Sequence, residues 1–373
     1  MSSADIFVIG GGIAGLSAAA ALAGHARVIL LEAEDAVGYH ASGRSATMLH
    51  YALGDPQVRA LTLASRPLFE DPPPSSSDVP LGHRMPVLIH AREDELAELD
   101  RLQAAIAPFA TLERVGEEGI LDLCPAICVG DGGSVAALVD RNGIRLDPHA
   151  LLQAHVRTLR ANGGAIVTNA RVRTLTHAND HWTVQTERGE TFTAPILINA
   201  AGAWADSVAA LAGLGALGLQ SLRRTIITFD GPAGVDTSAW PFAKTVGDEL
   251  YFAPESGRLF ASPMDEGPAE PCDAQPDEYE VALAAHRVEQ RTTMQVGRIH
   301  GRWAGLRTFA PDRHLIAGFD PRADGFFWLA GQGGFGQQTS PAMARIIESL
   351  VAGTLWPVDS VSAEDLSPAR FLA

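Results

Sequence analysis

The chain has 373 residues, which is long enough to bury a large core and too long for a single small domain, so we expect two domains. Its formal net charge of -16 would repel the phosphates of nucleic acids and of anionic membrane surfaces, so nucleic acid is not an expected partner. The three cysteines, Cys124, Cys128 and Cys272, form no disulfide framework and lack partners at zinc spacing, so we expect reduced thiols and no metal site.

The N-terminal segment predicts a dinucleotide-binding turn. An apolar strand, Ile6 to Ile9, runs into Gly10-x-Gly12-x-x-Gly15, an Ala-rich helix follows, and a second strand, Arg27 to Leu31, ends at Glu32. The glycines of such a unit allow the tight turn, the approach of the backbone to a pyrophosphate, and the packing of helix on strand. The helix N-terminus offers N–H groups to the phosphates, and Glu32 is placed to accept a hydrogen bond from a ribose 2′-hydroxyl. The carboxylate favours FAD or NAD over NADP.

The next segments are less regular. A glycine-punctuated loop from residue 37 leads into Ala46 to Leu53, which we interpret as a helix, and Pro72 to Ser77 reads as an exposed linker. A strand is expected from Val87 to His90 and a charged helix from Glu93 to Ala105.

The second half of the chain begins with a helix start. Asp147-Pro148 reads as an N-cap followed by proline in the first turn, and short alternating strands between residues 165 and 194 predict a small meander. A buried strand, Pro195 to Ala200, follows. The loop from Pro263 to Asp277 is acidic and proline-rich, and we expect it to be mobile. Near the C-terminus a strand, a glycine loop (residues 331–336) and a helix from Ser340 complete the pattern.

Neither a signal peptide nor a membrane span is predicted. The N-terminus is a strand and glycine turn without a basic flank, and the apolar run from Ala194 to Leu222 is interrupted by polar residues and glycines. We therefore expect a soluble, cytoplasmic protein.

The layout of the elements separates two kinds of dinucleotide protein. NAD dehydrogenases usually build the nucleotide domain from one continuous run of βα units, whereas this chain has one βαβ unit, a meander, and a second glycine loop near the C-terminus. That layout resembles the flavoproteins of the D-amino acid oxidase and sarcosine oxidase family. The resemblance covers essentially the whole chain and rests on the N-terminal glycines, Ser42-Gly43-Arg44-Ser45, Ile196-Leu197-Ile198-Asn199-Ala200-Ala201-Gly202-Ala203-Trp204, Trp303-Ala304-Gly305-Leu306-Arg307-Thr308-Phe309-Ala310-Pro311-Asp312 and Gly331-Gln332-Gly333-Gly334-Phe335-Gly336.

The resemblance implies an α/β fold with a Rossmann-like FAD-binding domain and an inserted α+β substrate domain with a mixed sheet. The FAD-binding domain would comprise residues 1–80, 145–222 and 300–373, and the substrate domain residues 81–144 and 223–299. Within the family, segments such as Pro56-Gln57-Val58-Arg59-Ala60-Leu61-Thr62 resemble FAD-dependent D-arginine dehydrogenases.

FAD is the cofactor that the resemblance implies. Covalently flavinylated relatives carry a cysteine where this chain has Gly305, so we expect non-covalent FAD. Backbone N–H groups of the C-terminal glycine loop could stabilise negative charge on the reduced flavin, although the loop could also be a plain turn. The expected FAD-binding residues are Gly10, Gly12, Ile13, Ala14, Gly15, Glu32, Ala33, Ser42, Gly43, Arg44, Ser45, Ala46, Val172, Ala200, Gly202, Trp204, Gly305, Gly331, Gly333, Gly334, Phe335, Gly336, Gln338 and Thr339.

The substrate carboxylate needs fixed cations, and the planar fork of arginine suits this role. The resemblance places Arg224, Tyr251 and Arg307 at the carboxylate site, with Gly334 beside the reacting centre. For each arginine the alternative is a surface ion pair, and Arg223 is the neighbouring candidate for Arg224. His50 could be a catalytic base, or a structural histidine on an apolar face.

The expected side-chain pocket departs from the D-arginine pattern. D-arginine-type enzymes carry a glutamate after the proline at position 86, where this chain has Val87, and Met48 and Leu53 replace polar residues. Such a pocket would favour apolar side chains and leave a cation unpaired, unless these residues are plain core.

Together these features predict an FAD-dependent D-amino acid dehydrogenase or oxidase with a preference for neutral, hydrophobic substrates. The imino acid product would hydrolyse to a 2-oxo acid and ammonia. The alternatives are oxidation of a secondary amine, a glycine derivative or a 2-hydroxy acid, an FAD-binding subunit without turnover, and an NAD(H) dehydrogenase. The electron acceptor stays open between oxygen and a quinone, and a quinone would bring the protein to the membrane surface.

Overall fold

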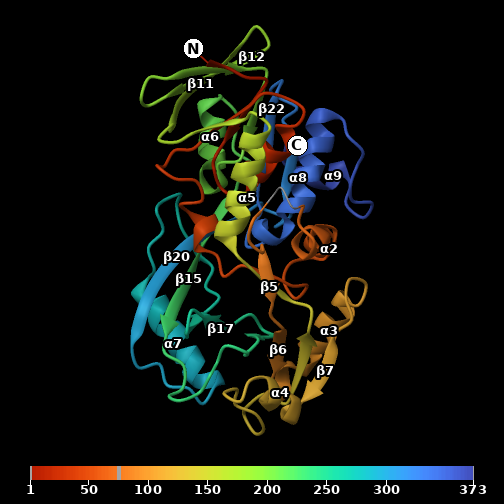
Figure 1. The fold of residues 1–373 in the computed structure, drawn as a ribbon, viewed down its shortest axis with the longest axis vertical. Coiled ribbons are helices and arrows are strands. Elements are labelled where there is room, and N and C mark those ends of the chain that lie inside the picture. Colours follow the sequence, from red (N-terminus) through yellow and green to blue (C-terminus); the bar gives the residue numbers. More distant parts are fainter. Residues whose placement is uncertain (1, 74–76, 373) are drawn as a thin grey trace.

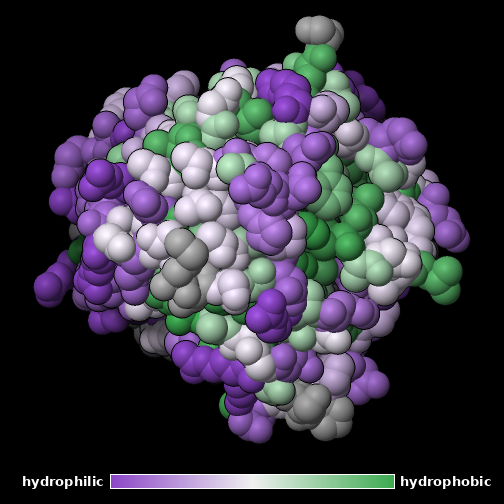
Figure 2. Space-filling model, turned by 90° about the horizontal axis from the view of Figure 1, so that it is seen from above, coloured by the Kyte–Doolittle hydropathy of each residue, from purple (hydrophilic) through white to green (hydrophobic). Residues whose placement is uncertain are grey.

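The computed structural model describes residues 2–73 and 77–372, so part of the predicted linker, residues 74–76, lies outside the described residues. Two large sheets lie toward opposite ends of the long axis, and both termini lie at the upper end (Figure 1). Seen from that end, the surface is mainly hydrophilic, with apolar residues gathered in one area right of centre (Figure 2). Among the described residues, no helix is both long and apolar enough to cross a membrane.

The six-stranded sheet carries the predicted nucleotide unit. Its strands are nearly continuous runs of apolar residues because helices or neighbouring strands cover both faces. All neighbours pair in parallel except the last two, which are antiparallel. The strand order is β10 (Ala165–Val167), β3 (Val28–Leu31), β2 (Ile6–Ile9), β14 (Ile196–Asn199), β22 (Phe326–Ala330) and β21 (Ile316–Phe319).

Helices cover this sheet and one another. Helix α1 (Ile13–Leu22) packs against α5 (Pro148–Ala161) and α8 (Gly336–Ala352), and α2 (Pro56–Glu70) packs against α8. The predicted N-cap of α5 is confirmed, because the Asp147 side chain accepts a hydrogen bond from the Ala150 N–H. The short helices α6 (Ala205–Leu211) and α9 (Ala363–Leu366) lie at the same end of the molecule.

Three of the four predicted meander strands form, together with β1 (Ser2–Ser3), a separate four-stranded sheet beside the six-stranded one. Its order is β1, β13 (Thr191–Ala194), β12 (His181–Thr186) and β11 (Val172–Ala178). The first predicted strand is β10, which pairs with β3 in the six-stranded sheet instead.

The nine-stranded sheet forms the other end. One face is packed on α7 (Glu278–Arg291), whereas α3 (Leu96–Ile106) packs on β6 and β8, and α4 (Glu117–Leu123) on β7 and β8. Its order is β19 (Gly267–Pro268), β15 (Gln220–Phe229), β18 (Arg258–Ser262), β17 (Tyr251–Glu255), β16 (Phe242–Thr245), β6 (Val87–Ala91), β8 (Ala136–Asp140) and β7 (Glu113–Gly116), and β20 (Ile299–Phe309) pairs with β15.

Register divides the side chains of this sheet between two cores. Ile227, Ala261 and Phe252 are aligned across three strands and belong to the core under α7. Because side chains alternate along a strand, Ile226 and Tyr251 belong to the opposite core, with Met48 and Val87. Strands β15 and β20 stay paired from Phe229 and Ile299 to Gln220 and Phe309. The expected domain boundaries at residues 223 and 300 therefore fall inside these paired strands.

The prediction of a helix from Ala46 to Leu53 is wrong. Strand β4 (Met48–Leu49) pairs with β9 (Ile144–Leu146), which also pairs with β5 (Gly82–Arg84). Thr47 and Gly54 have φ angles of 48° and 78°, which interrupt a right-handed helix on both sides of the segment. Helix α2 starts only at Pro56, where the Asp55 side chain caps it by accepting a hydrogen bond from the Val58 N–H.

Candidate active site

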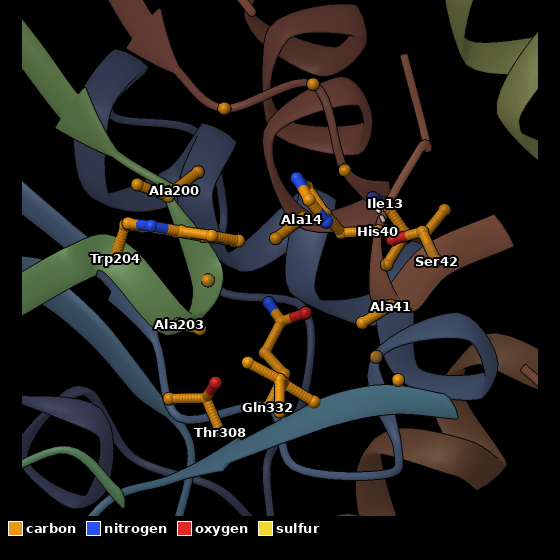
Figure 3. A pocket seen from close by; sticks show the side chains of 18 of the residues that line it. Ile13, Ala14, His40, Ala41, Ser42, Ala200, Ala203, Trp204, Thr308 and Gln332 are labelled. Atoms are coloured by element: carbon orange, nitrogen blue, oxygen red, sulfur yellow. Dashed lines mark hydrogen bonds between the residues drawn. The ribbon is translucent and has the colours of Figure 1, made fainter. Parts of the chain in front are cut away.

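A cavity of about 430 Å³ lies where the carboxyl ends of β2, β3, β14 and β22 approach β15 and β20. Such an edge is the usual ligand site of an open parallel sheet. In the close view, Trp204 lies on the opposite side from Ser42, and Gln332 projects between them (Figure 3). Segments from five separate parts of the sequence meet here, so the fold alone creates the site.

The N-terminal glycine turn is held by backbone contacts that leave no room for side chains. Gly10 has a φ of 109°, and a Cβ atom there would lie 2.4 Å from the Ala200 carbonyl oxygen. A Cβ atom on Gly15 would lie 1.9 Å from the Gly10 carbonyl oxygen. The turn therefore delivers the N-terminus of α1 to the cavity with its first N–H groups directed there.

Two side chains fix this turn. The Ser42 hydroxyl accepts a hydrogen bond of 2.9 Å from the Ile13 N–H. The Glu32 carboxylate accepts hydrogen bonds from the N–H groups of Gly11 at 2.6 Å and Glu34 at 2.8 Å. Because each carboxylate oxygen can accept more than one hydrogen bond, Glu32 keeps capacity for a ribose hydroxyl while it braces the loop.

Arg44 joins three segments at the cavity wall. Its guanidinium donates to the carbonyl oxygens of Ala274 at 3.0 Å and Ala304 at 3.2 Å and pairs with Asp273 at 2.5 Å. The Arg44 carbonyl accepts from the Trp303 indole N–H at 3.1 Å. These bonds attach the loop from Pro263 to Asp277, expected from its composition to be mobile, to the wall of the cavity. They leave Arg44 a structural connector rather than a free cation.

The C-terminal glycine loop closes another side. Gly331 and Gly333 have φ angles of 70° and 51°, and a Cβ atom on Gly333 would lie 2.3 Å from the Phe309 ring. A Cβ atom on Gly334 would lie 3.1 Å from the Arg307 Cζ atom. The loop leads directly into α8, so its backbone approaches both the cavity and the Arg307 guanidinium.

Most of the expected FAD-binding residues line this cavity. They are Gly10, Gly12, Ile13, Ala14, Glu32, Ala33, Ser42, Arg44, Ser45, Ala46, Val172, Ala200, Gly202, Trp204, Gly305, Gly331, Gly333, Gly334 and Gly336.

Five expected residues lie behind the lining. Gly15 and Gly43 make close backbone contacts, Phe335 precedes α8 and packs on Phe309, the Gln338 amide donates to Thr62, and the Thr339 hydroxyl donates to the Phe335 carbonyl. Their contacts support the walls.

The cavity suits a dinucleotide in its chemistry. Glycines leave backbone N–H groups uncovered at the start of α1, where a pyrophosphate would meet the positive end of the helix dipole. Glu32 lies at the end of β3 for a ribose, and the glycine loop before α8 offers a second set of backbone groups to the flavin ring.

Two expected carboxylate-binding residues share one face of the β15–β20 ladder. Arg224 pairs with Gly305 and Arg307 pairs with Leu222, so the two arginines are diagonal neighbours. Both line the cavity. Arg223 faces the other way and forms an ion pair with Asp277, so register distinguishes the two neighbouring arginines.

The two guanidinium groups are short of partners. Arg224 is 5% exposed; its Nε donates to the Asp265 carbonyl at 2.8 Å and its Nη2 contacts Glu266 at 3.4 Å, but its buried Nη1 has no partner among the described residues. The Arg307 side chain makes no hydrogen bond or ion pair within the described part of the chain. Burial, and secondarily the positive charge of Arg224, lowers the pKa of Arg307 to about 10. An anion would relieve both effects.

Tyr251 is buried on the same face of the sheet, one layer behind the lining. Its hydroxyl has no hydrogen-bond partner among the described residues. A buried, unpaired hydroxyl is costly, so a polar ligand atom at this position would be stabilising.

His50 lies away from the cavity, in a small apolar pocket with Val87 and Asp140. Its Nδ1 accepts from the Ala52 N–H at 3.3 Å and its Nε2 has no partner in the described structure. Burial, with a smaller effect of the Lys244 charge, lowers the pKa of His50 to about 3. The imidazole is therefore neutral at physiological pH.

The three residues of the expected side-chain pocket, Met48, Leu53 and Val87, pack in one apolar cluster with Tyr251 and Ile226. Ile226 lines the cavity, whereas the three do not. They lie behind its apolar wall.

Sequence reasoning missed several polar groups near the site. Gln332 lies among the glycines of the C-terminal loop, and its side chain projects into the cavity (Figure 3). Asp265 and Glu266 hold Arg224 from a loop whose position no local pattern reveals. Arg145 lies near Tyr251. The sequence pattern that could have indicated it is a charged residue between two apolar residues in the strand Ile144–Leu146.

Curated relatives match most of the chain. It is 24% identical over 407 residues to FAD-dependent oxidoreductase domain-containing protein 1 of Bos taurus, covering 93% of this chain and 81% of that protein. It is 25% identical over 331 residues to glycerol-3-phosphate dehydrogenase 1 of Mycobacterium bovis, covering 81% of this chain but only 62% of that protein.

Solved structures show the same fold at lower identity. L-alpha-glycerophosphate oxidase from Mycoplasma pneumoniae, described with FAD bound, has a TM-score of 0.85 at 19% identity, over 94% of this chain and 95% of its own. L-proline dehydrogenase from P. horikoshii has a TM-score of 0.84 at 18% identity, over 100% and 98%. The expected fold class is thus confirmed, with FAD as the cofactor.

The family model for FAD dependent oxidoreductases (DAO) matches residues 5–350, which include the glycine turn, both arginines and the C-terminal glycine loop. The chain therefore belongs to the DAO family of FAD-dependent oxidoreductases.

Proposed function

We propose that this enzyme oxidises a D-amino acid at Cα, with a neutral or hydrophobic side chain favoured, to an imino acid that hydrolyses to a 2-oxo acid and ammonia. The observation that carries the proposal is the pair Arg224 and Arg307. Both face the cavity from adjacent strands, and neither has its full set of partners in the described structure. Two guanidinium groups with unpaired donors beside a dinucleotide site indicate a carboxylate ligand.

The chain's own residues would hold and orient the substrate. The free Nη1 of Arg224 and the Arg307 fork would bind the carboxylate, and the unpaired Tyr251 hydroxyl would donate a further hydrogen bond. The wall formed by Ala46 and Ile226 would exclude water on the side-chain side. When bound, FAD would accept the hydrogen and electron pair from Cα.

His50 would serve a structural role. A neutral imidazole with a pKa of about 3, enclosed in a separate pocket, is a poor base for an ammonium group at neutral pH. If the amine binds in its neutral form, no protein base is needed at that nitrogen. Gly334 would contribute by its lack of a side chain, because any Cβ atom would displace the Arg307 guanidinium.

A cationic side chain should be disfavoured. Met48, Leu53 and Val87 offer no carboxylate behind the apolar wall, and two arginines already stand at the cavity. Leaving the guanidinium of such a substrate unpaired would cost about 2–5 kcal/mol of transition-state stabilisation, which lowers kcat/KM. D-Arginine and D-lysine should therefore react more slowly than D-leucine, D-methionine and D-phenylalanine.

A phosphate ester of glycerol is the second candidate substrate. Two arginines short of partners could bind a phosphate as well as a carboxylate. The likeness to a glycerophosphate oxidase and a glycerol-3-phosphate dehydrogenase favours including it.

The test is anaerobic reduction of the bound flavin, followed as loss of the yellow absorption. The panel should contain the D- and L-forms of leucine, methionine and arginine, glycerol 3-phosphate, and isopentylamine as the decarboxylated analogue of leucine. Among the compounds of this panel, we expect D-leucine or D-methionine to be fastest and isopentylamine to be inert. Faster reduction by glycerol 3-phosphate or D-arginine would overturn the proposal, as would bleaching by no compound.

We also propose that the FAD is bound non-covalently, because Gly305 offers no thiol. Acid precipitation should release all the yellow colour as FAD. Flavin retained in the precipitate would contradict this proposal.

A further inference from the structure

A third arginine, Arg145, is partly buried outside the lining of the cavity. Arg145 is the central residue of β9 and is aligned with Met48 on one side and His83 on the other. Its guanidinium lies over the Phe260 ring, 4.5 Å from the ring centroid. Because Phe260 belongs to the same core as Met48, Ile226 and Tyr251, Arg145 approaches the region behind the cavity wall.

Arg145 has donors to spare. Its side chain is 14% exposed, and its Nη2 pairs with Glu255 at 2.5 Å. Its Nη1 is buried and has no partner among the described residues. Burial lowers the pKa of Arg145, and the nearby Glu255 carboxylate and Tyr251 hydroxyl oppose that effect only in part. A buried charged donor without a partner is destabilising, so the site would gain from an acceptor.

Tyr251 connects Arg145 to the other two arginines. Its ring packs edge-on against Phe260 with centroids 6.1 Å apart, so Tyr251 and Arg145 share one aromatic neighbour. Tyr251 also shares its core with Ile226, which lines the cavity together with Arg224 and Arg307. Unpaired buried donors are therefore found on Arg224, which lines the cavity, and on Tyr251 and Arg145, which do not.

The core that contains Tyr251 and Ile226 is apolar. Ile226 lines the cavity, and it shares one apolar cluster with Met48, Met264 and Phe260. Methionine side chains adapt their shape readily, so this cluster could repack around a short hydrocarbon chain. A ligand suited to the whole region has a carboxylate at each end and methylene groups between.

We propose that Arg145 is a specificity-determining residue that binds a second carboxylate, at the end of the substrate side chain, so that the preferred substrates are amino acids with an acidic side chain on an apolar stem, such as D-glutamate. This rests on the proposed function, because Arg224 and Arg307 must hold the α-carboxylate. It departs from the expectation of a neutral side chain: the stem stays apolar, but the terminus is anionic.

The first experiment measures binding without turnover. Glutarate and pentanoate have the same carbon number and differ by one carboxylate, and each is titrated into the FAD-loaded protein while the flavin absorption is followed. We expect glutarate to bind at least tenfold more tightly than pentanoate. Arg145→Met should abolish that difference and leave the Kd of pentanoate within about threefold of wild type.

The controls separate a local effect from damage to the fold. Arg141→Met removes an exposed arginine, paired with Glu113, from the preceding β-turn region and should preserve the glutarate preference. Arg145→Lys keeps the charge without the fork and should retain part of it. The Tm and the flavin content of each variant show whether it folds. If Arg145→Met does not fold, the comparison of wild type with Arg145→Lys provides the test.

The second experiment measures kcat/KM for D-glutamate and its isostere D-glutamine, with D-leucine as reference. Wild type should prefer D-glutamate by tenfold or more through a lower KM, Arg145→Met should lose this preference, and Arg141→Met should keep both the preference and the D-leucine rate. Equal binding of glutarate and pentanoate, or an unchanged preference in Arg145→Met, overturns the inference. Failure to bind either carboxylate would instead overturn the proposed function.

Discussion

The nucleotide side and the substrate side of the cavity recognise their ligands by different means. At the start of α1 and before α8, backbone atoms and glycines form the surface, and the side chains nearby, such as Ser42 and Glu32, are already hydrogen-bonded. On the β15–β20 ladder, arginine side chains form the surface, and Nη1 of Arg224 and the Arg307 side chain have no partner in the described structure. On the first side the side chains are already paired without a ligand, whereas on the second side some are not.

This difference shows where binding energy would arise. A backbone cradle costs little to keep in place, because the sheet and helices that form it satisfy the rest of its hydrogen bonds. Buried arginine donors without partners destabilise the folded protein until a ligand pairs with them. Substrate binding would therefore offset the free energy lost when these charged groups were removed from water. Mutations on the first side should therefore affect cofactor retention, and mutations on the second side should affect catalysis.

The largest expected effect is that of Gly15→Ala. The added methyl group would lie 1.9 Å from the Gly10 carbonyl oxygen, so the turn must open and α1 must shift. We expect the purified variant to contain no flavin and to have a lower Tm. Gly24→Ala, whose new Cβ atom would be 4.0 Å from the nearest atom, is the matched control. Full flavin content in Gly15→Ala would show that the cradle tolerates side chains.

Arg307→Met tests the substrate side alone. The Arg307 guanidinium lines the cavity and makes no hydrogen bond within the described part of the chain, so removing it should disturb no other residue. The variant should therefore keep FAD. It should lose about 2–5 kcal/mol of transition-state stabilisation, measured as kcat/KM for the best substrate. Discrimination against the decarboxylated amine should weaken as well. Wild-type kcat/KM together with an unchanged preference for the acid would return Arg307 to a structural role.

The pH dependence of stability tests the assignment of His50 as structural. The pKa of His50 in the folded protein is about 3, below the ordinary value of 6.5. Between these two pH values the imidazole is therefore protonated in the unfolded chain but neutral in the folded protein. The free energy of unfolding should therefore fall as pH drops from 6.5 toward 3. His50→Leu should remove on the order of 1–3 kcal/mol of that fall between pH 7 and 4, measured by urea unfolding. His90, whose pKa is also lowered to about 3 by burial, provides a second instance in His90→Leu.

The smallest expected effect is that of Tyr251→Phe. The change removes one neutral donor and preserves the packing against Phe242 and Phe260. The loss of transition-state stabilisation, measured from kcat/KM, should therefore be only about 0.5–1.5 kcal/mol. FAD content and Tm should stay at the wild-type level. A loss as large as that of Arg307→Met would mean that the hydroxyl does more than assist carboxylate binding.

Local signals predicted the nucleotide side well. The glycine turn, the Asp147 cap and the strands of the meander are each determined by neighbouring residues, and the fold that they imply is confirmed. The segment Ala46 to Leu53 failed because its apolar residues pair with β9, far along the chain, and this pairing overrides helical propensity.

The substrate side depended on contacts that no local pattern encodes. Arg224 and Arg307 were proposed by resemblance, and only the register of β15 against β20 shows that they share a face. Arg145 was missed because its neighbours in space, Phe260 and Glu255, lie more than a hundred residues away in sequence. The positions of Asp265 and Glu266 likewise follow from a loop that folds back on β15.

The long pairing of β15 with β20 has a consequence for how the chain can diverge. Because side chains alternate along a strand, inserting or deleting one residue in either strand would turn Arg224 or Arg307 toward α7 and away from the cavity. Insertions should therefore be tolerated in the turns and loops that join the outer strands, while the length of this ladder stays constant. Changes of substrate would then arise by replacing side chains around a fixed pair of arginines.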